Sequence, residues 1–218
     1  MSDKFNKIYE KSINNPEKFW SDASDDIFWF KKPTKILNKS NPPFYKWYED
    51  GVTNTCYNAL DIHIDQGNGK RAALIYDSPI TGNKSKFTYE ELRHKVSKFA
   101  GALKGQGVSK GDRVIIYMPM IPEAVVAMLS CARIGAIHSV VFGGFASNEL
   151  ASRIDDSKAK VLVTASCGFE PGRTVEYKPL VDEAIKLANH KIDKMILFQR
   201  SGHEVKLNAP KEVSWEEV

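Results

Sequence analysis

Apolar and polar residues follow two different periods in the part of the chain after residue 88. A Thr-x-x-Glu capping box, made by Thr88 and Glu91, marks the start of the first regular segment. Apolar side chains then recur at helical spacing, at Leu92, Val96, Phe99 and Leu103. This pattern predicts an amphipathic helix that ends at Gly105 and Gly107, because glycine commonly terminates helices.

Short apolar runs separate the helical segments. They predict a buried strand over residues 113–118 and further strands over residues 138–142, 161–165 and 195–198. Helical spacing predicts further helices over residues 122–133, 148–154 and 180–189. A strict alternation of strands and helices is typical of parallel strands joined by right-handed helical crossovers. The sequence therefore predicts an α/β fold built on a parallel sheet with alternating helices.

Residues 1–62 have a different character, because they are dense in aromatic residues and show no sustained helical or strand period. Prolines at 33, 42 and 43 break the segment into short pieces. Large rings in such number are expected to be mostly packed. We interpret the segment as one that wraps the core, rather than as an aromatic patch that binds a ligand. The predicted boundary separates it from a larger domain over residues 63–218.

Composition narrows the classes of function. Basic and acidic residues, 31 and 27 in number, are interspersed, so the net charge of +4 forms no basic face and no nucleic-acid partner is expected. No apolar run approaches the roughly 20 residues of a membrane helix. Residues 1–20 match neither a signal peptide nor a transit peptide. These features predict a soluble, cytoplasmic protein with no membrane partner.

The cysteines and histidines offer no catalytic or metal site. Cys56, Cys131 and Cys167 fit no metal-ligand spacing, so reduced thiols, no disulfide and no metal are expected. No basic residue is placed to activate Cys167, which favours an inert thiol. The five histidines are scattered, and His138 is expected in the core or at a sheet edge. Because a G-x-S-x-G elbow is also absent, no catalytic residue is assigned.

A pair of glycines forms the first candidate ligand site. In open parallel sheets, ligands bind beyond the carboxyl ends of strands. The strand that ends at Phe142 is followed by Gly143 and Gly144, which would let a ligand approach the backbone and its N–H groups. The alternative is that the two glycines only make a tight turn.

The loop after the next strand is the second candidate. It is rich in turn residues and ends with Glu170, Pro171, Gly172 and Arg173. An arginine in this position suits a phosphate group. The alternative is that Arg173 only pairs with Glu170 or Glu176. Neither loop is a dinucleotide fingerprint or a P-loop, because the chain contains no G-x-G-x-x-G and no G-x-x-x-x-G-K-[ST].

Several motifs resemble those of the acetyl- and propionyl-CoA synthetases, the short-chain branch of the adenylate-forming enzymes. The longest are DRVIIYMP at residues 112–119 and ARIGAIHSVVFGGF at residues 132–145. Shorter ones are WYEDG at 47–51, YNALD at 57–61 and FTYEEL at 87–92. The resemblance covers nearly the whole chain. It implies that residues 1–62 are the amino-terminal segment of this branch and that residues 63–218 are the first part of its AMP-binding domain.

The resemblance implies a ligase whose substrates are a short-chain carboxylate, ATP and CoA. The carboxylate attacks ATP to give an acyl-adenylate and pyrophosphate, and the CoA thiol then displaces AMP. Phe142, Gly143 and Gly144 match a stretch that contacts CoA in this family. The loop Glu170, Pro171, Gly172 and Arg173 matches the one that meets the nucleotide bearing the 3'-phosphate.

The chain also departs from the family pattern. Glu170 stands where acetyl-CoA synthetases carry an arginine, and the loop is closer to that of propionyl-CoA synthetases, so propionate is the preferred acid. The family's phosphate loop, acid pocket, magnesium-binding glutamate and small carboxy-terminal domain are expected beyond Val218. The chain alone is therefore expected to be inactive and prone to self-association. A non-catalytic CoA-binding or structural module is the main alternative. A nicotinamide-dependent oxidoreductase is disfavoured by the missing glycine fingerprint.

Overall fold

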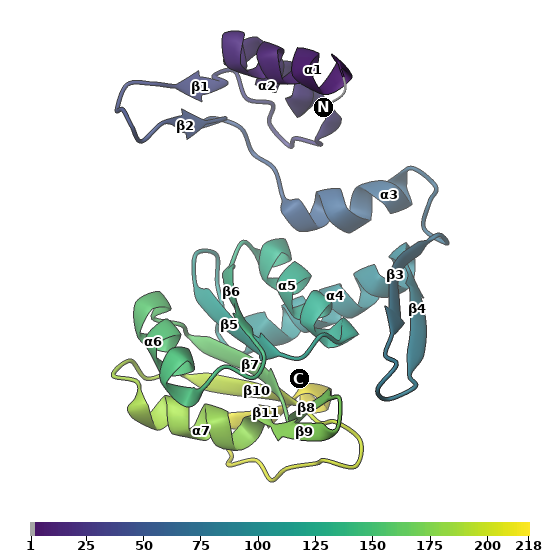
Figure 1. Cartoon of the computed structure of the whole chain (residues 1–218), viewed down its shortest axis with the longest axis vertical. Helices are drawn as coiled ribbons and strands as arrows, with labels where there is room; N and C mark the ends of the chain where they lie inside the picture. Colours follow the sequence, from purple (N-terminus) through teal and green to yellow (C-terminus); the bar gives the residue numbers. More distant parts are fainter. Residues whose placement is uncertain (1–2) are drawn as a thin grey trace. The chain divides into compact units, whose positions relative to one another are not determined.

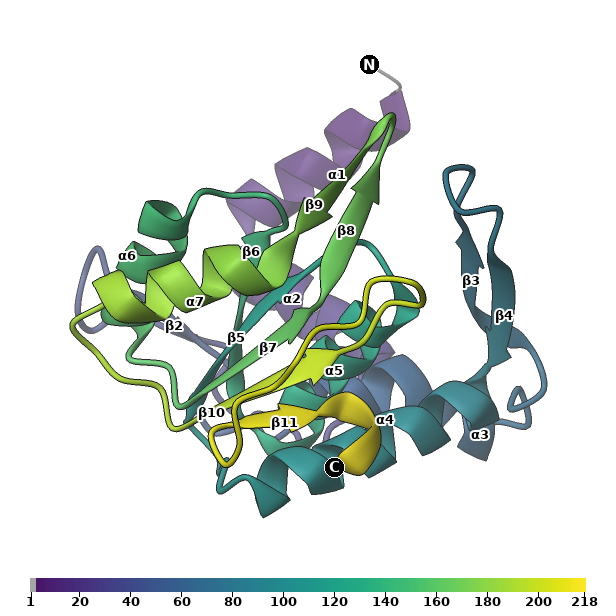
Figure 2. The same cartoon turned by 90° about the horizontal axis from the view of Figure 1, so that it is seen from below.

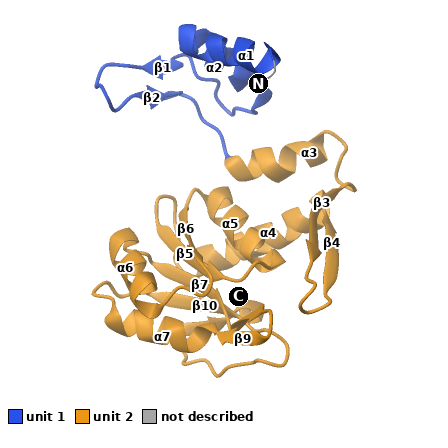
Figure 3. Ribbon diagram, viewed as in Figure 1, with its two compact units in different colours: residues 1–54 blue, residues 55–218 orange. Residues whose placement is uncertain are grey.

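The computed structural model describes residues 3–218 and divides the chain into two compact units, Met1–Asn54 and Thr55–Val218 (Figure 3). The sequence-based division at residue 62 falls within the second unit, where a π-helical turn, η2 (Tyr57–Asp61), runs directly into α3 (Ile62–Asp65). The division of the chain into domains at residue 62 stays a prediction.

The first unit consists of short elements. They are α1 (Asp3–Asn14), α2 (Pro16–Ala23), the 3-10 turn η1 (Ser24–Asp26) and the antiparallel strands β1 (Leu37–Asn38) and β2 (Lys46–Trp47). Aromatic rings hold them together, with Trp20 edge-on to Trp47 and Trp29 against Tyr48. Other rings, such as the 75% exposed Phe44, stay open to solvent. The expected packing of the aromatic residues is therefore incomplete.

The second unit contains a five-stranded parallel sheet with the strand order β11-β10-β7-β5-β6 (Figure 1). Its strands are β5 (Arg113–Met118), β6 (Ile137–Phe142), β7 (Val161–Ala165), β10 (Lys194–Phe198) and β11 (Glu212–Ser214). Its main helices are α4 (Tyr89–Gly105), α5 (Pro122–Ile134), α6 (Ser147–Ser157) and α7 (Tyr177–Leu187), and the 3-10 turn η3 (Trp215–Glu217) ends the chain. The predicted α/β fold with a parallel sheet is confirmed.

Each face of the sheet buries its own core, because side chains alternate along a strand. On β5, Val114 and Ile116 pack with residues of α4 and α5, whereas Ile115 and Tyr117 pack with residues of α6 and α7. Figures 1 and 2 show these helix pairs on opposite sides of the sheet. Strands buried on both faces have the continuous apolar runs that the sequence shows.

The predicted capping box is present at the start of α4. The Thr88 Oγ1 accepts a hydrogen bond from the Glu91 amide at 3.2 Å, and the Glu91 carboxylate accepts one from the Thr88 amide at 2.8 Å. Two backbone donors that have no partner within the helix are thereby satisfied.

The strict alternation of strands and helices is wrong at two places, because β10 and β11 are parallel neighbours with no helix between them and an unpredicted hairpin follows β7. The segment predicted as a loop after β7 forms an antiparallel hairpin, β8 (Cys167–Glu170) and β9 (Arg173–Glu176), that projects beyond the sheet (Figure 2). Its two-residue turn is Pro171–Gly172, in which Gly172 has a φ of +75°. Proline followed by a glycine with positive φ is the type II turn combination, which returns the chain on itself. A second hairpin, β3 (Ala72–Asp77) and β4 (Lys84–Thr88), precedes α4.

The last helix begins earlier than predicted. We expected it from residue 180, after Pro179, but α7 begins at Tyr177. Proline is tolerated in the first turn of a helix, where its missing N–H has no intrahelical partner to lose. None of the helices in residues 3–218 combines the length and the apolar character that a membrane span requires.

Candidate functional site

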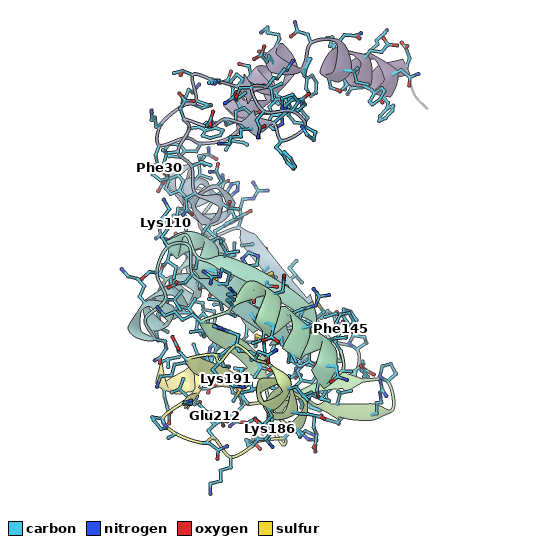
Figure 4. All side chains as sticks on the ribbon, turned by 90° about the vertical axis from the view of Figure 1, so that its left-hand side faces the viewer. Phe30, Lys110, Phe145, Lys186, Lys191 and Glu212 are labelled. Atoms are coloured by element: carbon cyan, nitrogen blue, oxygen red, sulfur yellow. The ribbon has the colours of Figure 1, made fainter. Side chains whose placement is uncertain are left out.

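The carboxyl ends of the parallel strands open onto a cleft of about 370 Å³. Met118 at the end of β5, Phe142 at the end of β6 and Glu170 on β8 line it, and the β3–β4 turn (residues 78–81) closes one side. Lys110 precedes β5 and Phe145 follows β6, so the two residues mark opposite ends of these neighbouring strands in Figure 4, and Phe145 marks the carboxyl end. The volume is within the range of small-molecule sites, roughly 300–1,000 Å³.

Of the predicted glycine pair, Gly143 lines the cleft and Gly144 follows it, and the structure requires glycine at each position for a different reason. A Cβ at Gly143 would collide with the Tyr177 Oη, so only glycine lets this phenol reach its place. Gly144 has a φ of +97°, in the left-handed region that favours glycine. Its amide donates to the Tyr117 Oη at 3.2 Å, and that hydroxyl donates to the Phe145 carbonyl at 2.9 Å. The Gly144 amide is therefore bonded within the protein, and a role of Gly143 and Gly144 in binding a ligand stays a prediction.

The second predicted loop contributes one residue to the cleft. Glu170 lines it, whereas Pro171, Gly172 and Arg173 form the tip and the outer strand of the hairpin and do not. Both the Nε and the Nη2 of Arg173 lie 2.7 Å from the Glu170 Oε2, and the arginine side chain is 71% exposed. This contact agrees with the alternative that Arg173 pairs with Glu170. A role of Arg173 in binding phosphate stays a prediction, in which a ligand would share or replace Glu170.

Two further residues on the floor of the cleft were not singled out from the sequence. One is Tyr177, the first residue of α7, which is 4% exposed. Its ring lies 4.9 Å from that of Tyr117, and its Oη is held over Gly143 and Gly168. Burial raises the pKa of Tyr177 to about 12, so the phenol is protonated at neutral pH and can donate a hydrogen bond. No hydrogen-bond partner for this Oη lies within residues 3–218.

The other residue is Arg200, two positions after β10 and only 9% exposed. Its guanidinium lies over the ring of Phe169, 4.7 Å from the centroid, and His203 packs edge-on against the same ring. The rule that ligands bind beyond the carboxyl ends of strands also applies to the loop after β10, so it could have found Arg200.

Buried Ser166 holds both residues in position. Its Oγ accepts a hydrogen bond from the Arg200 amide at 2.9 Å, and its carbonyl accepts one from the Tyr177 amide at 3.0 Å. Its own amide donates to the Phe198 carbonyl at 2.9 Å, which ties the end of β7 to the end of β10. These hydrogen bonds fix the backbone positions of Tyr177 and Arg200, from which their side chains project.

The two acidic residues that line the cleft, Asp77 and Glu170, each form an ion pair with a basic residue. Asp77 pairs with Lys84 at 2.8 Å, and Glu170 pairs with Arg173. Glu123, in a neighbouring hollow that Arg200 also lines, has a pKa raised chiefly by burial, which the charges of Lys95 and Arg200 only partly oppose. No ion pair joins it to Arg200 within the part of the chain that the structure describes.

Cys167 and His138 lie in the surroundings that the sequence indicated. Cys167 is buried, and desolvation raises the pKa of its thiol, which disfavours the reactive thiolate. His138 lies on β6, an edge strand of the sheet, as expected for a core or edge residue. Among residues 3–218, no cluster of three or more His, Cys, Asp or Glu side chains could hold a metal ion.

Two family models together match nearly all of this chain. The model described as "AMP-binding enzyme" matches residues 63–217, and the model described as "Acetyl-coenzyme A synthetase N-terminus" matches residues 5–59.

Two curated relatives extend this likeness. The chain is 52% identical over 210 residues to human acyl-CoA synthetase short-chain family member 3, mitochondrial, which covers 96% of this chain and 31% of the relative. It is 45% identical over 212 residues to the acetyl-coenzyme A synthetase of Streptomyces coelicolor, which covers 97% of this chain and 32% of the relative. The chain thus spans about a third of the length of these proteins. The word mitochondrial in the first name overturns the expectation of a cytoplasmic location, which the composition of residues 1–20 was insufficient to decide.

A solved structure agrees in fold. The acetoacetyl-CoA synthetase from Streptomyces lividans superposes with a TM-score of 0.83 over 95% of this chain and 31% of its own, at 24% sequence identity. This chain therefore shares the fold of that region of the solved structure.

Proposed function

Because this chain belongs to the family of AMP-binding enzymes, whose model matches residues 63–217, we propose that it is part of a short-chain acyl-CoA synthetase. The protein joins propionate or acetate to CoA at the expense of ATP, with propionate preferred. Residues 1–62 are the amino-terminal segment of this branch, and residues 63–218 begin its AMP-binding domain. ATP and CoA are substrates, and magnesium accompanies ATP at residues outside this chain.

The proposed reaction has two steps. A carboxylate oxygen attacks the α-phosphorus of ATP, the new P–O bond forms as the bond to pyrophosphate breaks, and an acyl-adenylate results. The CoA thiol then loses its proton and attacks the acyl carbon, and AMP leaves with the electrons of the C–O bond. The first step supplies the second with a good leaving group. This chain provides part of the CoA site and no catalytic residue.

The observation that carries the proposal is the cleft at the carboxyl ends of the strands. It is lined by Phe142, Gly143 and Glu170, which the resemblance to the short-chain acyl-CoA synthetases assigns to CoA. Gly144 holds the turn beside it, and Pro171, Gly172 and Arg173 form the hairpin tip at its edge. Apolar walls with a few polar groups suit the pantetheine arm of CoA, which carries methyl groups and amides.

The experiment compares two glycine variants in the intact protein. Gly144→Ala puts a side chain at a φ of +97°, and the control Gly67→Ala does the same at +82°, after α3, with nothing within 4 Å of the new Cβ. Each costs roughly 1–2 kcal/mol of backbone strain. Only Gly144→Ala is expected to raise the KM for CoA, with acid-dependent exchange of pyrophosphate into ATP unchanged, because the exchange needs no CoA.

The outcomes separate the proposal from its alternative. Formation of propionyl-CoA or acetyl-CoA with release of AMP supports the ligase. CoA binding without acid-dependent exchange supports the non-catalytic CoA-binding module. If Gly144→Ala and Gly67→Ala change the KM for CoA equally, the cleft is not the CoA site.

A further inference from the structure

Arg200 and Tyr177 are two buried hydrogen-bond donors on the floor of one cleft that lack protein acceptors. Arg200 is 9% exposed and Tyr177 is 4% exposed, and both line the cleft. Within residues 3–218, the guanidinium of Arg200 has neither a hydrogen bond nor an ion pair, and its side-chain contact is the ring of Phe169. Neither residue has a fully buried, unpaired side-chain donor atom in residues 3–218, so the donor atoms of both reach the open space of the cleft. Donors that are held at a cleft without a protein acceptor are available to a ligand. This pair points to a ligand that supplies the acceptors.

The charges around the cleft define the kind of ligand. The carboxylates of Asp77 and Glu170 are neutralised by Lys84 and Arg173. Arg200 makes no ion pair in residues 3–218, although Glu123 lies in the neighbouring hollow that it also lines, and the aromatic face of Phe169 orients it without neutralising it. A planar guanidinium with several N–H donors, beside a protonated phenol, matches the oxygens of a phosphate group.

We propose that Arg200 and Tyr177 bind the diphosphate that joins the pantetheine arm of CoA to its nucleoside. This inference rests on the proposed function, because it takes CoA as the ligand of the cleft. CoA carries two separate anionic groups, the diphosphate and the 3'-phosphate. Arg200 lies on the floor of the cleft, and Arg173 lies outside it on the β8–β9 hairpin, so each anionic group has a cation of its own.

Ser166 explains why this pair is positioned before any ligand binds. Its Oγ and carbonyl fix the backbones of Arg200 and Tyr177, and Gly143 and Gly168 leave room for the Tyr177 Oη. At Gly168, a Cβ would lie 2.7 Å from that oxygen. Donors that are held in place need no reorganisation when an anion arrives, which favours affinity.

The test uses calorimetric titration of this chain with three ligands. CoA carries both the diphosphate and the 3'-phosphate, dephospho-CoA lacks the 3'-phosphate but keeps the diphosphate, and pantetheine has no phosphate. Arg200→Gln is expected to weaken CoA and dephospho-CoA by the same factor, about tenfold or more, since charge-assisted hydrogen bonds have this magnitude. Pantetheine is expected to bind the variant and the parent equally. Unchanged affinity for dephospho-CoA, or an equal loss for pantetheine, overturns the proposal.

Tyr177→Phe is the second variant, and it decides the matter if Arg200→Gln does not fold. It removes only an Oη without a protein partner, so the melting temperature is expected to hold while affinity for dephospho-CoA falls about fivefold. Tyr117→Phe is the matched control, because it removes an Oη that bonds Gly144 and Phe145 and should lower the melting temperature. If Tyr177→Phe binds dephospho-CoA as the parent does, the diphosphate assignment is wrong.

Inorganic pyrophosphate separates this inference from the proposed function. If the parent chain binds no CoA but binds pyrophosphate, and Arg200→Gln abolishes that binding, the anion site stands while the CoA assignment fails. If the parent binds neither pyrophosphate nor dephospho-CoA, the anion site itself is overturned.

Discussion

Replacing Arg173 by alanine should reduce the preference of the protein for CoA over dephospho-CoA. In the ligand-free chain, two nitrogens of Arg173 lie 2.7 Å from the Glu170 carboxylate, and the side chain is 71% exposed. A 3'-phosphate must therefore compete with Glu170 for the guanidinium. The change is predicted to act on the ligand that carries the 3'-phosphate and to spare the one that lacks it.

The magnitude follows from the two competing interactions. A hydrogen bond to a charged group contributes about 1.5–3 kcal/mol, and an exposed ion pair contributes about 0.2–1 kcal/mol. Giving up part of the pairing with Glu170 leaves roughly 1–2 kcal/mol for the phosphate, a preference of about fivefold to thirtyfold for CoA. Salt should reduce it, because screening acts on exposed charges.

The assay measures the Kd values of both ligands, for the parent and for two variants of the intact protein. Arg173→Ala should bring the ratio close to one. Glu170→Gln is the matched variant, which frees Arg173 and removes a carboxylate, so it should raise the ratio above that of the parent. A ratio that is the same for Arg173→Ala and the parent would show that Arg173 serves only to pair with Glu170.

Three further outcomes are expected. The 218-residue chain alone should catalyse no acid-dependent exchange of pyrophosphate into ATP, and exchange above background would contradict this. The exposed apolar residues Ile137 and Val140 on edge strand β6 should cause concentration-dependent self-association in light scattering, which Val140→Lys should suppress; a strictly monomeric parent would refute it. Thr88→Ala should cost about 1 kcal/mol in denaturant unfolding, and an unchanged midpoint would rule out the cap as a source of stability. Hydrogen bonds from Thr88 lower the pKa of Glu91 in the folded protein. The stability that the Glu91 carboxylate contributes is therefore fully present above the usual glutamate pKa and is lost as the pH falls through the lowered pKa of the folded state. Glu91→Gln should lack this dependence of the free energy of unfolding on pH.

The sheet could be predicted because its central strands are apolar on both faces. Residues 113–118 and 161–165 read as continuous apolar runs, and in the structure β5 and β7 lie between two cores. The β8–β9 hairpin was missed because Gly168 and Glu170 interrupt any strand pattern, although Pro171–Gly172 marks its turn.

The candidate site was predictable only where a local signal exists. Paired glycines are the local signal at residues 143–144, of which Gly143 lines the cleft. Arg200 carries no motif, and its importance comes from what lies around it: the ring of Phe169 from β8 and a hydrogen bond from its amide to the Ser166 Oγ, with no ion pair in residues 3–218. The position of Arg200 after a strand could be predicted from the sequence, but its surroundings come from segments far apart in the chain and could not.

The crowding around the Tyr177 Oη has a consequence for how related sequences can diverge. Gly143 on the loop after β6, Gly168 on β8 and Tyr177 on α7 share one small volume, so a side chain can enlarge at one position only if another shrinks. Alanine at Gly168 would meet the phenol oxygen at 2.7 Å and ring carbons at 3.0 and 3.1 Å, of which phenylalanine at 177 relieves only the first. The three positions are therefore expected to change together or not at all during evolution, and two substitutions that are each harmful alone can be neutral in combination.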